Sequence, residues 1–250
     1  MQPSEFQTMI ATDDRHWWYR GRRRIVMDAI ERIAPGPGAR ILDAGCGSGR
    51  TLDELARWGD ASGLDAEPAG VAAARSRGHA DVRVGAVEQL PWPDGTFDLV
   101  TCLDVIEHTP DDRHTLAELR RVTRPGGHLV VTVPAYRSLW SSHDVANGHY
   151  RRYSRGSLRR ACSDAGWVAR AETSFNAILL APIALVRWAG RLRRTTPTRS
   201  DLRLTPGSFG PLLEFPLRIE AALLRRGVRL PAGVSILAVL RNPGPPEAGR

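Results

Sequence analysis

The stretch Ile41-Leu42-Asp43-Ala44-Gly45-Cys46-Gly47-Ser48-Gly49 runs from apolar residues into three alternating glycines, with an acid just before them. A strand that ends in a glycine-rich turn and leads into a helix is the place where α/β proteins bind nucleotide-like ligands. Glycines allow the backbone to approach the ligand closely because they carry no Cβ atom. The stretch therefore predicts an α/β fold with a nucleotide-like ligand at this turn.

The residues around these glycines exclude two common phosphate-binding turns. The dinucleotide fingerprint needs a third glycine three residues after its second, and Arg50 occupies that position. Asp43 would also repel a pyrophosphate group. A P-loop is excluded because no Gly-Lys-Ser/Thr follows and the chain contains no lysine. An acid suits a ligand that carries an ammonium and a sulfonium group but no phosphate, and S-adenosylmethionine is such a ligand.

A second acid follows at the end of the next expected strand. Ala61-Ser62-Gly63-Leu64 predicts a short strand that ends in Asp65, about 20 residues after the turn, where an acid can accept hydrogen bonds from two ribose hydroxyls. Taken alone, Asp65 also fits the N-cap of a helix over Pro68–Arg77. The order and spacing of the two acids favour the ribose contact.

Several further segments resemble the class I S-adenosylmethionine-dependent methyltransferases, in particular their small bacterial type 11 group. The resemblance lies within residues 39–134 and rests on Leu42–Gly49, Leu64–Asp65, Glu88–Val100, Asp104–His108 and Leu119–Gly127. It implies a doubly wound, mostly parallel seven-stranded α/β sheet of the Rossmann-like methyltransferase fold. Ala86 departs from the pattern, because family members often carry an acid there. Adenine contact then falls to backbone groups near Ala86 and Val87, or to Glu88.

The resemblance also implies which residues contact the cofactor, S-adenosyl-L-methionine. It places Asp104 near the methionine part of the cofactor and His108 close to the methyl group. The cofactor-binding candidates are Asp43, Ala44, Gly45, Cys46, Gly47, Gly49, Asp65, Ala66, Val87, Glu88, Leu103, Asp104, Val105 and His108.

Reactive side chains gather after the expected fourth and fifth strands, where ligands bind in this kind of sheet. Histidine has a pKa suited to proton transfer near neutrality, and His143 beside Asp144 is one candidate base. Arginine pairs bidentately with carboxylate or phosphate. The catalytic candidates are His108, His143, His149 and Tyr150, and the substrate-binding candidates are Tyr136, Trp140, Arg151, Arg152 and Tyr153. The alternative is a structural loop whose polar groups bond to the backbone.

An aromatic and basic segment precedes the expected core. Residues 1–15 are polar and are expected to be mobile, and a helix is predicted over Arg22–Ile33. The segment His16–Arg24 either docks this helix through its aromatic residues or forms a lid with an arginine reaching the cofactor's carboxylate. This segment and Gly148–Tyr153 resemble a bacterial subgroup that is often linked to glycan, cell-envelope or secondary-metabolite pathways.

Strand and helix patterns alternate from Arg40 to Val133, and the alternation predicts a parallel sheet with helices on both faces. About 60 residues then separate the last two expected strands, which is far beyond an ordinary loop. We therefore divide the chain into an N-terminal segment with a lid helix (1–38), a cofactor-binding core (39–176), a helical insert or cap (177–233), and a last strand with a tail (234–250).

The insert begins with the apolar run Ala177–Val186, which Pro182 interrupts and which is about half the length needed to span a bilayer. One interpretation is a buried helix over the sheet, and another is a cap over an apolar substrate. A third is an interfacial helix within residues 177–194 that contacts membrane peripherally through its arginines: Arg187, Arg191, Arg193 and Arg194. A flexible segment over Thr195–Ser208 and a second helix over Leu212–Arg226 complete the expected insert.

The composition of the chain limits which partners, metal sites and cellular locations are expected. The formal net charge is +8, but no RNA-binding signature interrupts the fold, so nucleic acid is not expected as a partner. The three cysteines have unrelated spacings that predict neither disulfides nor a metal site. Since Met1–Ile10 lacks a signal-peptide core, a cytoplasmic location is expected, with contact at the inner face of the membrane as an option.

These observations predict methyl transfer to a small-molecule, glycan- or lipid-linked acceptor, at oxygen. Two alternatives remain open. An RNA methyltransferase is favoured only by the charge, and a non-catalytic interaction protein that keeps the cofactor-binding fold is favoured only by Ala86.

Overall fold

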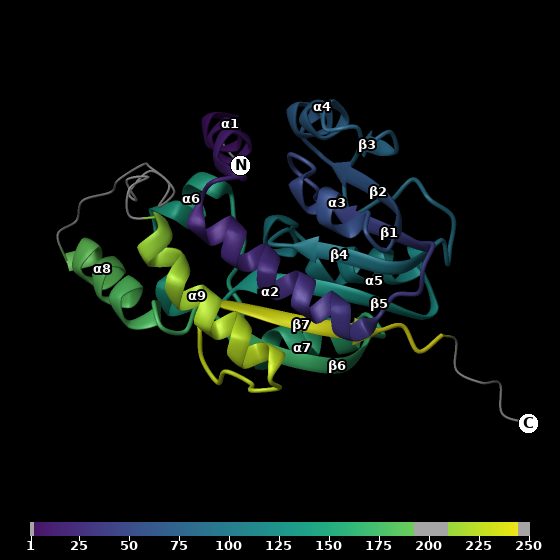
Figure 1. The fold of residues 1–250 in the computed structure, drawn as a ribbon. Helices are drawn as coiled ribbons and strands as arrows, with labels where there is room; N and C mark the ends of the chain where they lie inside the picture. Colours follow the sequence, from purple (N-terminus) through teal and green to yellow (C-terminus); the bar gives the residue numbers. More distant parts are fainter. Residues whose placement is uncertain (1–2, 193–209, 245–250) are drawn as a thin grey trace, which may run out of the picture.

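The computed structural model describes residues 3–192 and 210–244 (Figure 1). Its strands are β1 (Ala39–Ala44), β2 (Gly59–Asp65), β3 (Val82–Val84), β4 (Phe97–Leu103), β5 (Thr123–Pro134), β6 (Val168–Phe175) and β7 (Ser235–Arg241). They form one seven-stranded sheet in the order β3-β2-β1-β4-β5-β7-β6. Every neighbouring pair is parallel except those of β7, which is antiparallel to β5 and β6. The predicted doubly wound, mostly parallel α/β sheet is confirmed.

Helices cover both faces of this sheet (Figure 1). One face carries α2 (Trp17–Ile33), α3 (Arg50–Leu55), α4 (Pro68–Ser76) and α9 (Gly210–Arg225), and the other carries α5 (Asp112–Val122) and α7 (Arg155–Asp164). Successive strand residues point to opposite faces. Accordingly, Ile41 belongs to the apolar cluster under α2, whereas Leu42 belongs to the cluster under α5 and α7.

The N-terminal segment is more ordered than the sequence predicts. Helix α1 (Pro3–Thr12) lies where we expected a mobile stretch, so that expectation is wrong for residues 3–12. Helix α2 begins at Trp17 rather than at Arg22, because the His16 side chain accepts a hydrogen bond from Trp18 N at 3.3 Å and caps the helix. The aromatic segment is therefore the first turns of α2.

The insert between β6 and β7 contains two helices that differ in packing. Helix α9 lies along α2, and the contact is so close that a Cβ atom on Gly21 would lie 2.3 Å from Leu217 Cδ1. Helix α8 (Leu180–Leu192) projects from one end of the molecule (Figure 1). Its Leu185, Val186 and Trp188 side chains are 64%, 66% and 62% exposed, so the buried-helix interpretation is wrong for this part of the apolar run.

The segment expected to be flexible, Thr195–Ser208, lies outside the described residues, as do Arg193 and Arg194. Within the described part of the chain, none of the helices combines the length and the hydrophobicity required to cross a bilayer.

Candidate active site

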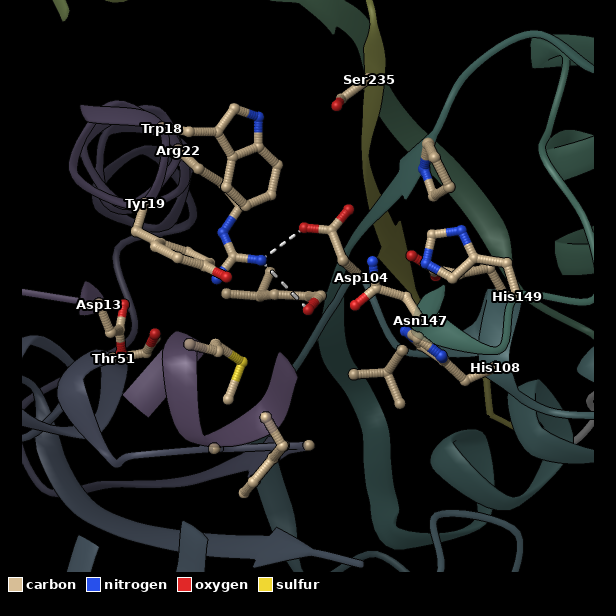
Figure 2. A pocket seen from close by; sticks show the side chains of 18 of the residues that line it. Asp13, Trp18, Tyr19, Arg22, Thr51, Asp104, His108, Asn147, His149 and Ser235 are labelled. Carbon is tan, nitrogen blue, oxygen red and sulfur yellow. Dashed lines mark hydrogen bonds and ion pairs between the residues drawn. The ribbon is translucent and has the colours of Figure 1, made fainter. Parts of the chain in front are cut away.

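A cavity of about 540 Å³ lies beyond the carboxyl ends of the parallel strands. Its wall combines helices α1 and α2, the glycine turn after β1, and the loops after β2, β4 and β5. Figure 2 shows Trp18, Tyr19 and Arg22 on one side and His108, Asn147 and His149 on the other, with Asp104 between them. The cofactor-binding candidates that line this cavity are Asp43, Gly45, Cys46, Gly47, Asp65, Ala66, Val87, Glu88, Leu103, Asp104, Val105 and His108, whereas Ala44 and Gly49 do not line it.

The glycine turn requires glycines because its backbone has positive φ angles and because neighbouring side chains pack directly against it. Gly45 has φ +85°, and a Cβ atom there would lie 2.3 Å from Val105 Cγ2. Asp65 Oδ2 accepts a hydrogen bond from Gly47 N at 2.7 Å, and its Oδ1 accepts one from Glu67 N at 2.9 Å. Since Glu67 rather than Asp65 is the N-cap of α4, the helix-cap interpretation of Asp65 is wrong.

Asp43, the last but one residue of β1, is a buried acid with no cationic partner in direct contact among the described residues. Its Oδ1 accepts a hydrogen bond from Thr101 Oγ1 at 2.6 Å. Burial raises the pKa of Asp43 to about 7, although this hydrogen bond opposes the shift. A positively charged ligand beside this buried carboxyl would favour its ionised form, so the site is complementary to a cation. Together with a glycine turn that excludes side chains, this fits the positively charged, phosphate-free cofactor predicted from the sequence.

Asp104 is held at the centre of the cavity floor by contacts from two directions. Its backbone has φ +56°, and its Oδ2 accepts hydrogen bonds from Thr132 Oγ1 at 3.1 Å and from the Arg22 guanidinium. The guanidinium also lies 4.8 Å from the Trp18 ring centroid, within cation–π range. Helix α2 thereby brings an arginine to the place where the sequence suggested a cofactor lid.

The turn that the glycines form is also covered by residues 9–13, a stretch for which the sequence predicted no contact with the site. Ser48 Oγ donates to Asp13 Oδ2 at 2.6 Å, and Arg23 donates to Asp13 Oδ1 at 2.6 Å. The Met9 Cε atom is 3.2 Å from the position that a Cβ atom on Gly47 would take. These contacts make α1 part of the cavity wall.

Three histidines meet at the opposite side of the cavity. His108 belongs to the short 3₁₀ helix η1 (Ile106–His108) after β4, and His143 and His149 come from α6 (Ser142–Asn147) and the residues after it. The His108 and His149 ring centroids are 4.6 Å apart, and those of His143 and His149 are 6.1 Å apart. Burial lowers the pKa of His108 to about 3, so this ring is neutral at physiological pH.

Asp144 pairs with His149 rather than with its neighbour His143. Asp144 Oδ1 lies 2.8 Å from His149 Nδ1 and accepts a hydrogen bond from Arg152 Nε at 2.7 Å. Its Oδ2 accepts a hydrogen bond from Ser141 N at 2.8 Å, which completes the capping box of α6. Although burial acts in the opposite direction, these partners hold the pKa of Asp144 well below its usual range. The His143–Asp144 pairing considered from the sequence is therefore wrong.

Glu107 is a fully buried acid in the same wall. Among the described residues, neither of its carboxylate oxygens has a hydrogen-bond partner. Burial raises the pKa of Glu107 well above its usual range, and the Asp104 charge adds to this effect. Glu107 lies in the Asp104–His108 segment that carries the resemblance, but it is not among the site residues predicted from the sequence.

The remaining acceptor-side candidates occupy different places. Tyr150 is 59% exposed, and Tyr153 is buried in the core with its hydroxyl donating to Asp112 at 2.7 Å. Arg151 pairs with Asp112 at 3.0 Å. Of the nine catalytic and substrate-binding candidates, His108, His143, His149 and Arg152 line the cavity, and Tyr136, Trp140, Tyr150, Arg151 and Tyr153 do not. Cavity residues that we did not select from the sequence include Met9, Asp13, Thr51, Glu107, Asn147 and Ser235.

Comparison with known proteins places this geometry in a family. Residues 42–131 match the family model of a methyltransferase domain. Over 130 residues, the chain is 35% identical to a protein of Mycolicibacterium smegmatis named as a probable S-adenosylmethionine-dependent methyltransferase, an alignment that covers 51% of this chain and 49% of the relative. The chain carries a class I S-adenosylmethionine-dependent methyltransferase domain. S-adenosyl-L-methionine is accordingly the cofactor of this methyltransferase domain.

Other relatives agree with this assignment. The methyltransferase domain is 36% identical over 110 residues to a ubiquinone biosynthesis O-methyltransferase of Hahella chejuensis, which covers 41% of this chain and 46% of that protein. The methyltransferase in a solved complex with the Haloferax volcanii Trm112 methyltransferase activator shares the fold, with a TM-score of 0.63, 24% identity, and coverage of 96% of this chain and 98% of the other. The chain spans about half the length of the curated relatives named here.

Proposed function

We propose that the chain transfers a methyl group from S-adenosylmethionine to an oxygen atom of a small-molecule, glycan- or lipid-linked acceptor. The cofactor supplies a methyl group that is already activated by a positively charged sulfur. The protein must then hold the acceptor oxygen in line, exclude water, and remove the proton of the acceptor hydroxyl. The observation that carries the proposal is the Asp144–His149 pair at the cavity wall across from the glycine turn.

The cofactor side of the proposal rests on three acids. Asp65, held by the backbone of the glycine turn, would bind the ribose hydroxyls through its remaining lone pairs. Asp43 would face the cationic part of the cofactor, because a buried acid gains most from a positive neighbour. Asp104 would lie near the methionine part, with Arg22 beside it as the counter-charge for a carboxylate.

The acceptor side rests on His149. When Nδ1 donates to Asp144, Nε2 carries the lone pair that activates an acceptor hydroxyl. Asp144 is a positioning residue in this scheme, because it fixes the orientation and tautomer of the ring. Ubiquinone biosynthesis O-methyltransferases among the relatives support oxygen as the methylated atom.

Helix α8 supports a further part of the proposal, contact with a membrane that holds a lipid-linked acceptor. Leu185, Val186 and Trp188 present a row of apolar side chains to solvent. Arginines follow this row in the sequence, and basic residues beside an apolar helix face are typical of helices that bind anionic lipid surfaces. We propose that α8 binds the membrane peripherally.

One experiment tests the methyl transfer itself. The purified protein is incubated with labelled S-adenosylmethionine and a metabolite and lipid extract, and labelled products are identified by mass spectrometry. We expect an O-methyl ether or ester that is absent when His149→Ala replaces the wild-type protein. An N- or C-methylated product would contradict oxygen transfer, and binding of the cofactor without any product would favour a non-catalytic role.

A further inference from the structure

The strongest unexplained feature of the cavity wall is Glu107. This side chain is 0% exposed, and both carboxylate oxygens lack a hydrogen-bond partner among the described residues. A buried polar group without a partner is costly, and a buried charge costs more unless it is paired or coordinates a metal. The methyl-transfer scheme above assigns no task to this acid.

Two imidazoles lie beside the unpaired carboxylate. Glu107, His108 and His149 each offer one ligand atom, and these three atoms all lie within 4.8 Å of one another. The two rings stand almost perpendicular, at 84°. His108 is the next residue after Glu107 in η1, whereas His149 arrives from the loop after α6, so three ligands from two segments converge on one point of the cavity.

The contact behind His149 matches that of a metal ligand. His149 is bonded through Nδ1 to Asp144, which leaves Nε2 as its available nitrogen. Histidines that bind a metal almost always bond a carboxylate or backbone carbonyl through the other ring nitrogen, because this fixes the tautomer and the ring orientation.

We propose that Glu107, His108 and His149 bind one divalent transition-metal ion of the zinc, manganese, iron or cobalt class. Two imidazole nitrogens and one carboxylate oxygen favour these ions over magnesium and calcium, which prefer oxygen ligands. The prediction of no metal site rested on the spacing of the three cysteines, and none of the three proposed ligands is a cysteine. The remaining coordination positions of the ion would face the cavity.

This inference rests on the proposed function and specifies how the acceptor is activated. The ion binds the acceptor oxygen in place of a direct contact with His149 Nε2 and lowers the pKa of the hydroxyl. The hydroxyl proton passes to solvent water as the acceptor binds, before methyl transfer takes place in the water-excluded cavity. The acceptor oxygen then forms its bond to the methyl carbon, while the sulfur keeps the electron pair of the broken sulfur–carbon bond. The chemistry selects hydroxylated acceptors that can coordinate a metal, such as a vicinal diol or a phenol.

Cobalt provides a direct probe, because its visible absorption reports coordination independently of turnover. The full chain is treated with a chelator, dialysed, and titrated with Co²⁺ alone, and Zn²⁺ is then added as a competitor. We expect one Co²⁺ per chain with an altered visible spectrum, and displacement by Zn²⁺. Glu107→Gln and His149→Gln should each weaken Co²⁺ binding at least about tenfold, and Asp144→Asn should weaken it about 10- to 100-fold.

His114→Gln is the matched control, because His114 is an exposed imidazole on α5 outside the cavity, and this variant should bind Co²⁺ as the wild type does. Thermal unfolding confirms that each variant is folded, and His149→Gln carries the test if Glu107→Gln does not fold. Wild-type protein that binds no Co²⁺, or binds it equally in all variants, overturns the inference.

Cofactor binding separates this inference from the proposed function. Calorimetry with S-adenosylmethionine should give normal binding to Glu107→Gln, and Asp65→Ala should keep the Co²⁺ site while binding the cofactor at least about tenfold more weakly. A wild-type protein that binds cofactor but no Co²⁺ removes the metal site and leaves methyl transfer standing. The converse result removes the methyl-transfer proposal and leaves the metal site.

Discussion

His149 Nδ1 lies 2.8 Å from Asp144 Oδ1, and the same carboxylate oxygen accepts a hydrogen bond from Arg152 Nε at 2.7 Å. The carboxylate therefore neutralises a buried guanidinium and orients an imidazole at once. Asp144 is 0% exposed and Arg152 is 8% exposed. Both charged groups lose their hydration on folding, and their mutual pairing has to compensate for that loss. The stability of the loop between β5 and α7 and the orientation of a proposed functional histidine thus depend on one side chain.

Asp144→Ala should destabilise the protein by about 3–5 kcal/mol, because it leaves the buried charge of Arg152 unpaired. The measurement is the free energy of unfolding from urea denaturation. Adding Arg152→Met should recover part of the loss, since the second substitution removes the unpaired charge. Asp164→Ala is the control, because it breaks an exposed ion pair with Arg113 and should cost less than about 1 kcal/mol. Equal losses in both single variants would contradict the pairing argument.

Asp65→Ala should weaken cofactor binding at least about 10- to 100-fold, because even a single hydrogen bond to a charged group contributes about 1.5–3 kcal/mol. Calorimetry with S-adenosylhomocysteine measures the affinity. The control is Asp60→Ala, which removes an exposed acid near the opposite end of the same strand. This variant should bind S-adenosylhomocysteine as tightly as the wild type does. An unchanged affinity in Asp65→Ala would place the ribose elsewhere.

Asp43 should make both stability and cofactor affinity depend on pH. Its pKa is raised from 3.8 to about 7, so the folded protein keeps a proton that the unfolded chain releases. Stability of the cofactor-free protein should therefore fall as pH rises from the unfolded pKa to the folded one, by up to about 4 kcal/mol. Affinity for the cationic cofactor should rise over the upper part of this range, because binding favours the ionised carboxylate.

Asp43→Asn tests this prediction, since the amide oxygen can still accept the hydrogen bond from Thr101. Thermal unfolding and calorimetry between pH 4 and 8 should show flatter profiles for the variant than for the wild type, and weaker cofactor binding at the upper end. Parallel profiles for the two proteins would assign the pH dependence to another group.

Gly45→Ala should destabilise the protein by at least about 2 kcal/mol, because a left-handed backbone and an overpacked contact each carry a cost. The new Cβ atom would lie 2.3 Å from Val105 Cγ2, and the shift needed to relieve this contact should also abolish cofactor binding. Gly36→Ala is the control. A Cβ atom on Gly36 would have no neighbouring atom within 4 Å, and the φ angle of Gly36 is not positive. Unfolding and binding are measured on both variants, and a normal Gly45→Ala protein would refute the close-approach argument.

Leu185→Ser/Trp188→Ser should reduce co-sedimentation with anionic lipid vesicles, because the substitution removes the exposed apolar row of α8. Val84→Ser removes an exposed apolar side chain from β3 and serves as the control. Arg191→Ala/Arg193→Ala/Arg194→Ala tests the electrostatic part, and its loss of binding should be greatest at low salt. Vesicle binding that is identical in all variants would remove α8 from the proposed membrane contact.

The sequence predicted the sheet, and it also marked the acids that gather near the glycine turn, because local patterns carry that information. The spacing from Asp43 through the glycines to Asp65 is set by one strand–turn–helix–strand unit, and the structure brings both acids to one cavity. The acceptor side depends on contacts between distant segments. Tyr153 can lie in the core because Asp112, which is 41 residues away in the sequence, accepts the hydrogen bond of its hydroxyl group. No local sequence pattern predicts a partner at that distance.

The pairing of Asp144 could not be predicted for a similar reason. Neighbouring positions suggested His143, but the capping box with Ser141 turns the Asp144 side chain, and Gly148 at φ +69° reverses the chain so that His149 returns to it. Helix α1 was missed because its stability depends on tertiary contacts. Phe6 is buried beside α4, whereas the surrounding residues are largely polar.

The place of β7 in the sheet has a consequence for biosynthesis. In the described sheet, β6 pairs only with β7, which lies between it and β5. β6 ends at Phe175 and β7 begins at Ser235, so the ribosome needs about 3–12 s to make the intervening residues at about 5–20 residues per second. Throughout that interval the nascent β6 has no strand to pair with. The edge of the sheet beside β5 also stays open, so this side of the domain can close only after the insert helices have left the ribosome.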